Sequence, residues 1–142
     1  MQILQWLRRA LGRGLPLSTG AAGERRAEEF LSRLGYRVLA RNWRNPRDRR
    51  EELDLVCRDG EVLVFVEVKT RASTALVSGY EAVDQRKKKV LRRVADAYLR
   101  ALLPADRPLT FRLDVIEISG SGEGGEVRHF ENIPLFSKHY RP

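Results

Sequence analysis

Three charged residues near the middle of the chain have the types and spacing that divalent-metal chemistry requires. Asp54 is followed, after twelve intervening residues, by the run Glu67-Val68-Lys69. Two converging carboxylates are typical ligands of Mg²⁺ or Mn²⁺, with water and a substrate phosphate completing the coordination shell. A metal held in this way lowers the pKa of bound water and stabilises charge on a phosphodiester under attack. A lysine beside it would orient that water or stabilise the pentavalent phosphorane.

The segment that positions Glu67 and Lys69 has the character of a buried strand. Valine occupies positions 62, 64, 66 and 68, so one face of the strand is apolar. Because alternate side chains share a face, Glu67 and Lys69 point together to the other side. A strand that is largely apolar on both faces is typical of the centre of a sheet. Two charges there cost several kcal/mol unless each finds a partner or a metal.

The dipeptide Asp59-Gly60 predicts the hairpin that brings Asp54 to this strand. A two-residue loop at that point pairs Arg58 with Glu61, Asp54 with Phe65 and Glu52 with Glu67. Asp54 and Glu67 then become diagonal neighbours, with backbones about 7–8 Å apart. We therefore expect Glu52, Asp54, Glu67 and Lys69 on one face of the sheet. They form either a metal site or a structural network of ion pairs.

Apolar periodicity and turn residues predict the remaining elements. We expect helices over 21–34 and 81–103, and strands over 36–42, 52–58, 111–118 and 127–133. The basic stretch 44–50 is expected to be a loop, either solvated or in contact with phosphate. This order of elements predicts an α/β domain whose mixed sheet is flanked by helices.

Composition bounds the class of protein. The 142 residues are 42% apolar, which fits one globular domain over 20–136, with a flexible or amphipathic segment over 1–19 and a tail over 137–142. The net charge of +8 indicates a polyanionic partner, nucleic acid before a membrane surface. Cys57 is the single cysteine and is expected to be a buried, inert thiol. Without a membrane span or a signal peptide, the protein is expected in the cytoplasm.

Basic residues gather in two places that would contact phosphate. The helix predicted over 81–103 carries Arg86-Lys87-Lys88-Lys89 in its first half, with Asp84 as the one acid close by. A charged run on a helix is usually solvated, but a run of one sign favours phosphate contact. Together with the basic stretch 44–50, this pattern indicates nucleic-acid contacts at Lys87, Lys88, Arg44 and Arg49.

One acid, Glu24, is ambiguous on the sequence alone. It lies in the helix predicted over 21–34, near the edge of the apolar stripe. An acid in the first turn of a helix is favoured by the helix dipole, and that is the simpler interpretation.

Several motifs in succession resemble one family. They are Gly23-Glu24-x-x-Ala27, Asn42, Glu52-Leu53-Asp54-Leu55-Val56, Phe65-Val66-Glu67-Val68-Lys69-Thr70-Arg71, Lys87, Ala95, Tyr98-Leu99 and Arg112-Leu113-Asp114-Val115. In this order and spacing, over about residues 20–136, the chain resembles the YraN family of small bacterial proteins. That family is similar in fold to the restriction-endonuclease-like nucleases, which include archaeal Holliday junction resolvases.

The resemblance implies roles residue by residue. It implies metal binding by Glu24, Asp54 and Glu67, which with Lys69 would form the catalytic site, and so it reverses the simpler interpretation of Glu24. It implies a supporting role for Glu52 and phosphate contacts for Arg71 and Lys87. It gives no role for the pair Arg112 and Asp114. One departure is visible, because Glu51 stands where the family usually has glycine, after a longer basic stretch.

These observations predict a Mg²⁺- or Mn²⁺-dependent endonuclease with a restriction-endonuclease-like fold. Its substrate would be branched or single-stranded DNA in repair, recombination or uptake. A homodimer is expected, because resolvases of this fold cut two strands symmetrically. The alternative is a non-catalytic nucleic-acid-binding module that acts with a partner helicase, nuclease or recombination protein. An RNA-binding protein is disfavoured, because no aromatic cluster suited to base stacking is present.

Overall fold

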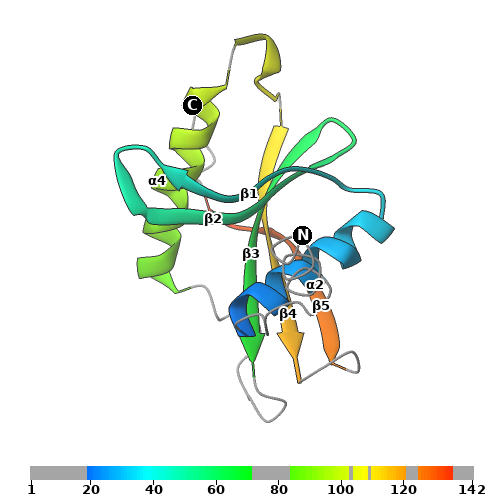
Figure 1. Ribbon diagram of the computed structural model, residues 1–142. Coiled ribbons are helices and arrows are strands. Elements are labelled where there is room, and N and C mark those ends of the chain that lie inside the picture. The colour runs from blue at the N-terminus through cyan, green and yellow to red at the C-terminus, as the bar shows by residue number, and fades with distance from the viewer. Residues whose placement is uncertain (1–18, 72–83, 103, 109, 121–124, 136–142) are drawn as a thin grey trace, which may run out of the picture.

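The structure is a computed structural model that describes residues 19–71, 84–102, 104–108, 110–120 and 125–135. Its elements are α2 (Thr19–Arg33), β1 (Arg37–Asn45), β2 (Asp48–Asp59), β3 (Val62–Arg71), α4 (Gln85–Ala101), the 3₁₀ turn η1 (Pro104–Asp106), β4 (Thr110–Ser119) and β5 (Glu126–Ile133). They form one sheet with helices packed against it (Figure 1). The expected N-terminal segment and C-terminal tail lie outside the described residues, except at Thr19.

The five strands are arranged in the order of the sequence, β1-β2-β3-β4-β5. Strands β3 and β4 pair in parallel, and the other neighbours pair antiparallel. Because parallel neighbours need a crossover connection, α4 lies between them in the chain. The expected α/β class, with a central mixed sheet flanked by helices as in restriction-endonuclease-like proteins, is confirmed. No helix among the described residues is long and apolar enough to cross a membrane.

Two apolar cores lie on the two sides of β3. Its residues Leu63 and Phe65 pack with α4, while Val64 and Val66 pack with α2. The helices supply apolar side chains at helical spacing, Ala27 and Leu31 from α2 and Leu91, Val94, Ala95 and Tyr98 from α4. The prediction that β3 is a buried central strand is therefore confirmed, as is the burial of the Cys57 thiol.

The β2–β3 hairpin differs from the expected register by two residues. Asp59 pairs with Val62 and Leu55 pairs with Val66, so the loop is Gly60-Glu61 and not Asp59-Gly60. Gly60 has a φ of +57°, and glycine at the first loop position is typical of a type II′ turn. Because the shift is an even number of residues, each side chain near the loop keeps its face. The shift moves Asp54 two residues along β3, from the level of Phe65 to the level of Glu67.

The basic stretch 44–50 is not the loop that the sequence predicted. Strand β1 continues to Asn45 and β2 begins at Asp48, which leaves only a tight turn between them. The Asn45 side-chain oxygen accepts a hydrogen bond from the Arg47 backbone N–H at 3.1 Å, which closes this turn. The polar composition of this stretch had predicted a longer loop. The hydrogen bond to Asn45 instead closes a tight turn, and the strands extend on both sides of it.

The β1–β2 hairpin changes faces at the level of Asp54. Leu53 packs into the core on the α4 side, whereas Leu55 packs into the core on the α2 side. Strict alternation would place both on one face. The change falls at Asn42, which has a φ of +46° and lies between the pairs Arg41–Leu55 and Trp43–Leu53. The expectation that four charged residues share one face therefore does not hold.

Candidate active site

Three carboxylates converge where α2 meets the middle of β2. Glu24 comes from α2, and Glu52 and Asp54 come from β2. One oxygen of each lies within 4.8 Å of the others, and all three residues are partly buried. We call Glu24, Glu52 and Asp54 the acid group. The structure thus brings two of the predicted metal ligands together with Glu52, for which the family resemblance implied only a supporting role.

Asn42 joins two members of the acid group. Its side-chain Nδ2 donates to Glu24 Oε2 at 2.8 Å and to Glu52 Oε1 at 3.0 Å. Arg44 Nε donates to the other oxygen of Glu52 at 2.8 Å. Asparagine tolerates the left-handed conformation found at position 42 better than other non-glycine residues, which suits it to this kink. The sequence motif included Asn42 without a role, and a polar side chain before the basic stretch was its only signal.

Gly23 sets how closely α2 approaches the sheet. A Cβ at this position would lie 2.2 Å from Thr70 Oγ1 of β3, which is far inside van der Waals contact. The absence of a side chain therefore lets the start of α2 lie directly on β3. Glu24 is the next residue, so the close approach also fixes the position of its carboxylate.

Asp54 occupies the point at which β2 leaves β3. The described pairing of these strands ends at Leu55–Val66, and Asp54 Oδ2 accepts the Val68 backbone N–H at 2.8 Å. The side chain thus replaces a strand hydrogen bond. Burial, followed by the charge of Glu67, raises the pKa of the Asp54 carboxyl to about 7, although the Val68 N–H opposes the shift. The chain therefore compensates the ionised form of Asp54 only in part, and the carboxyl holds a proton at a higher pH than an ordinary aspartate does.

Glu67 is held by two lysines. The residue is 2% exposed, and its Oε1 lies 3.1 Å from Lys69 Nζ and 3.2 Å from Lys87 Nζ. Lys87 reaches it from the first turn of α4, which is capped by Asp84. The other oxygen, Oε2, is buried without a hydrogen-bond partner in the described part of the chain. Glu67 lies outside the acid group, yet it is close enough to raise the pKa of Asp54.

The predicted phosphate-binding residues fall into two sets. Acids already hold three of them, since Arg71 Nε lies 3.3 Å from Glu117 Oε2, Lys87 contacts Glu67 and Arg44 contacts Glu52. Lys88 is half-buried on α4, and Arg49 is exposed on β2. Lys88 and Arg49 form the second set. No ion pair with another described residue would have to break before they contact a ligand.

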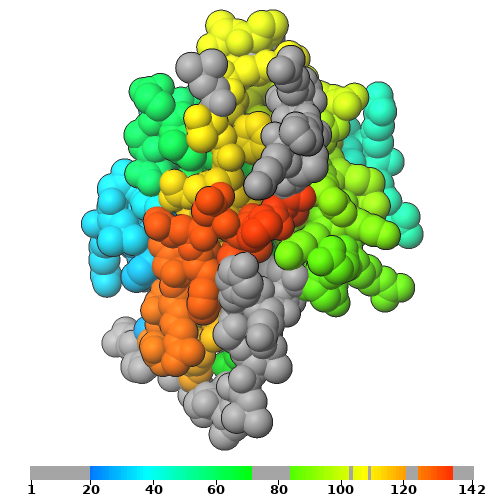
Figure 2. All heavy atoms as spheres, turned by 180° about the vertical axis from the view of Figure 1, so that it is seen from behind, coloured from blue at the N-terminus to red at the C-terminus, as the bar shows by residue number. Residues whose placement is uncertain are grey.

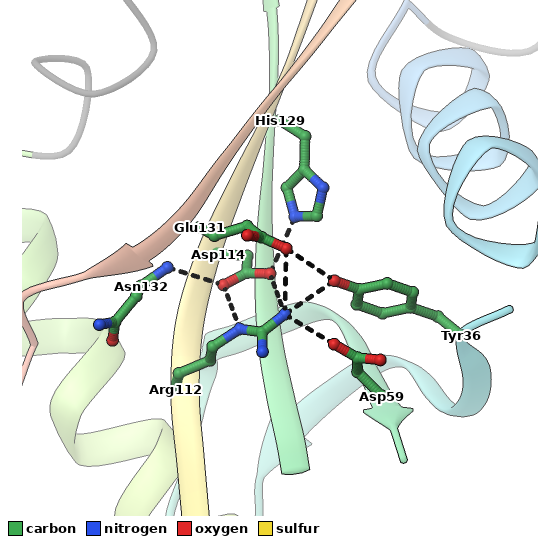
Figure 3. A network of polar contacts seen from close by, with 7 residues as sticks. All are labelled: Tyr36, Asp59, Arg112, Asp114, His129, Glu131 and Asn132. Carbon is green, nitrogen blue, oxygen red and sulfur yellow. Dashed lines mark hydrogen bonds and ion pairs between the residues drawn. The ribbon is translucent and has the colours of Figure 1, made fainter. Parts of the chain in front are cut away.

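Arg112 and Asp114, whose role the sequence did not give, form a second polar cluster (Figure 3). Asp114 is fully buried and is contacted by Arg112 Nε at 2.9 Å, His129 Nε2 at 2.8 Å and the Asn132 backbone N–H at 3.0 Å. Although burial opposes it, the hydrogen bonds from His129 and Arg112 lower the pKa of Asp114. Arg112 Nη2 also contacts Tyr36, Asp59 and Glu131. This cluster ties β4 and β5 to the end of β2 and to the residue before β1.

Comparison with known proteins places the chain among relatives that have no named activity. The model of an uncharacterised protein family, UPF0102, matches residues 23–118. A UPF0102 protein of Symbiobacterium thermophilum is 45% identical over 105 residues, covering 74% of this chain and 85% of that protein. One of Herpetosiphon aurantiacus is 37% identical over 130 residues, covering 90% and 96% of the two chains. One of Chlorobaculum parvum is 42% identical over 118 residues, covering 82% and 87%. The chain therefore belongs to the uncharacterised protein family UPF0102, the YraN family that its motifs resemble.

Proposed function

We propose that this protein is a Mg²⁺- or Mn²⁺-dependent endonuclease that hydrolyses phosphodiesters of DNA. The observation that carries the proposal is the convergence of Glu24, Glu52 and Asp54 within 4.8 Å, beside a buried glutamate that two lysines contact. The net charge of +8 supports a polyanionic substrate. The substrate would be branched or single-stranded DNA, and a second copy of the chain would account for cutting two strands.

The acid group fits a hard divalent cation. All its donors are carboxylate oxygens, the ligands that Mg²⁺ and Mn²⁺ prefer. Asp54 has a raised pKa, and the nearby Glu67 Oε2 is buried without a partner, so negative charge here remains uncompensated among the described residues. Glu24, Glu52 and Asp54 would hold the ion, with Glu67 next to it. When bound, the ion would lower the pKa of a water ligand and stabilise charge on the phosphodiester.

The lysines supply positive charge beside the acid group. Lys69 and Lys87 converge on one oxygen of Glu67 from two different elements, β3 and α4. The pair is therefore held in place before substrate arrives, which is the condition for effective electrostatic stabilisation of a transition state. Glu67 positions both ammonium groups. Lys69 would face the charge that develops on the phosphoryl oxygens.

The second candidate is a nucleic-acid-binding module without catalysis. It is favoured by one observation, namely that both lysines already neutralise Glu67 as a structural ion-pair network would. Such a module would act with a partner helicase, nuclease or recombination protein.

Nicking assays with matched variants distinguish the two candidates. The purified protein with Mg²⁺ or Mn²⁺ should nick branched or single-stranded DNA, and Lys69→Ala and Glu67→Ala should each slow nicking by about 10²-fold or more. DNA binding, measured by fluorescence anisotropy, should remain. Glu29→Ala is the control, because Glu29 is an exposed acid of α2 that pairs with Arg25. A binding protein that nicks none of the DNA structures with either metal would establish the second candidate.

A further inference from the structure

A buried glutamate fastens the β1–β2 hairpin to α4. Glu51 of β2 has a side chain that is only 8% exposed. Its Oε1 accepts from Arg93 Nε of α4 at 2.5 Å, and its Oε2 accepts from Asn45 Nδ2 of β1 at 2.8 Å. The contact connects an acid of the hairpin to a base of the helix.

The contact extends to the end of the hairpin. Asn45, which donates to Glu51, also accepts from the Arg47 backbone N–H at 3.1 Å. Across the turn, the Asp48 carboxylate accepts from the backbone and the guanidinium of Arg50. A chain of hydrogen bonds thus runs from α4 through Glu51 and Asn45 to the turn. It holds the arginines of the hairpin at a fixed distance from the helix.

Two basic rows result, one on each side of this contact. Arg86 and Lys89 precede Arg93 by seven and four residues, so they lie on the same side of α4 as Arg93. On the hairpin, Arg47, Arg49 and Arg50 are exposed. Arg47 and Arg49 have no acidic partner in the part of the chain that the structure describes.

The acid group lies at the base of the hairpin, next to Glu67, which Lys87 of α4 contacts. Asp54 is four residues from Arg50, which corresponds to roughly 13 Å along a strand. The helix row from Arg86 to Arg93 spans roughly 10 Å. Figure 1 shows the hairpin crossing in front of α4, and Figure 2 shows its end projecting past that helix at the edge of the molecule. The hairpin row thus runs away from Asp54, and the helix row begins one residue before Lys87, which contacts Glu67 beside Asp54.

We propose that Glu51 clamps the hairpin to α4 so that the two basic rows grip the phosphate backbones of double-stranded DNA beside the acid group. Two rows on separate elements match two backbones. Single-stranded DNA is bound by a basic groove together with aromatic side chains on which the bases stack, and the exposed large hydrophobic residues among those described are Leu34 and Leu39, neither of them aromatic. This inference rests on the proposed function for the identity of the ligand, DNA, but it does not require that the protein cleave DNA. Of the proposed substrates, it favours branched DNA, which has duplex arms, over single-stranded DNA.

The test measures binding of a 20-base-pair duplex against salt concentration in EDTA, so that cleavage does not interfere. Arg49→Ala on the hairpin and Lys89→Ala on the helix should each reduce the slope of log K against log[salt] by about 0.9, and the double variant by about 1.8. Arg25→Ala is the control with the same loss of charge, from a residue of α2 with a 72% exposed side chain. An equal effect of Arg25→Ala would overturn the proposal.

Glu51→Ala distinguishes a role of Glu51 in holding the hairpin to α4 from a purely electrostatic effect of its negative charge on DNA binding. The substitution removes a negative charge, so electrostatics alone predicts tighter binding, whereas loss of the clamp predicts binding weaker by about tenfold. Asn45→Ala breaks the hairpin side of the same contact without changing the charge and should weaken binding in the same direction. Tighter binding by Glu51→Ala, or unchanged binding by a folded Asn45→Ala, would overturn the inference. A wild-type protein that shows these binding effects but does not nick DNA would contradict the proposed function alone.

Discussion

Two clusters of this protein offer the same number of metal-ligand side chains and differ in what lies among them. Asp114, His129 and Glu131 bring ligand atoms within 4.8 Å of one another, as the acid group does. In the first cluster the guanidinium of Arg112 contacts Asp114 and Glu131 directly (Figure 3). In the acid group, Asn42 and the Val68 N–H are the donors between the carboxylates, and Arg44 contacts only Glu52.

The difference appears in the protonation of the two aspartates. Hydrogen bonds from His129 and Arg112 lower the pKa of Asp114 against the effect of burial, whereas burial and Glu67 raise the pKa of Asp54 to about 7. The cation of the first cluster contacts two of its acids, and the cluster serves to hold strands together. In the acid group Arg44 contacts Glu52. The donors to Glu24 and Asp54, an amide side chain and a backbone N–H, are neutral, which suits these two acids to an external cation.

Removing the internal cation should give the largest effect on stability. Arg112→Met leaves Asp114 fully buried without its charged partner, and breaking such a pair costs about 3–5 kcal/mol of unfolding free energy. Urea or thermal unfolding measures the change. The control is Arg128→Met, which breaks an exposed pair with Glu126 and should cost less than about 1 kcal/mol. Equal losses of unfolding free energy in the two variants would show that the cluster around Asp114 stabilises the fold no more than the exposed Arg128–Glu126 pair does.

Asp54 should give the next largest effect, as a dependence of stability on pH. Its pKa is about 7 in the folded protein against 3.8 for an ordinary aspartate, so the folded state binds more protons between these values. Metal-free protein should therefore lose stability as the pH rises from about 4 to about 7, by about 3 kcal/mol. This is less than the full value of about 1.36 kcal/mol for each pH unit, because the carboxyl is partly ionised in the unfolded state at about pH 4 and partly ionised in the folded state at about pH 7.

Asp54→Asn provides the control for this pH dependence. The amide does not ionise, so the loss of stability between these pH values should shrink by about the amount that Asp54 contributes. Urea unfolding at a series of pH values measures both proteins. Parallel curves for wild type and Asp54→Asn would place the titrating group elsewhere.

Asn42 should give the smallest effect of the three, on metal affinity. Asn42→Gly removes the amide that spaces Glu24 and Glu52, and glycine accepts the φ of +46° without strain. Loss of a group that orients metal ligands typically weakens metal binding by about tenfold or more. Isothermal titration with Mn²⁺ measures it.

Asn132→Gly is the matched variant in the other cluster. Asn132 also has a positive φ, of 56°, and it contacts Asp114 through its backbone N–H. It should leave Mn²⁺ affinity unchanged. If both glycine variants weaken Mn²⁺ binding equally, Asn42 does not position the acid group.

The sequence predicted those parts of the site that depend on local pattern. Alternating valines identified β3 and placed Glu67 and Lys69 together, and the resemblance drew attention to Glu24 and Asp54. The hairpin register was missed because Asp59-Gly60 and Gly60-Glu61 both offer glycine to a two-residue turn. A left-handed residue within a strand, such as Asn42, leaves no trace in hydrophobic periodicity. The Asp114 cluster gathers residues 36, 59, 112, 129 and 131, and only the tertiary fold brings these together.

Gly23 gives a final consequence for how the site would be mapped experimentally. A methyl group there would meet the hydroxyl of Thr70, so either this side chain or the start of α2, which carries Glu24, must shift. In a saturation mutagenesis screen scored by activity, Gly23 would rank with the acids although it carries no functional group. The distance between α2 and β3 at this point depends on position 23 having a hydrogen atom in place of a side chain. A larger residue at this position would therefore be the first change to try in a design that widens the site.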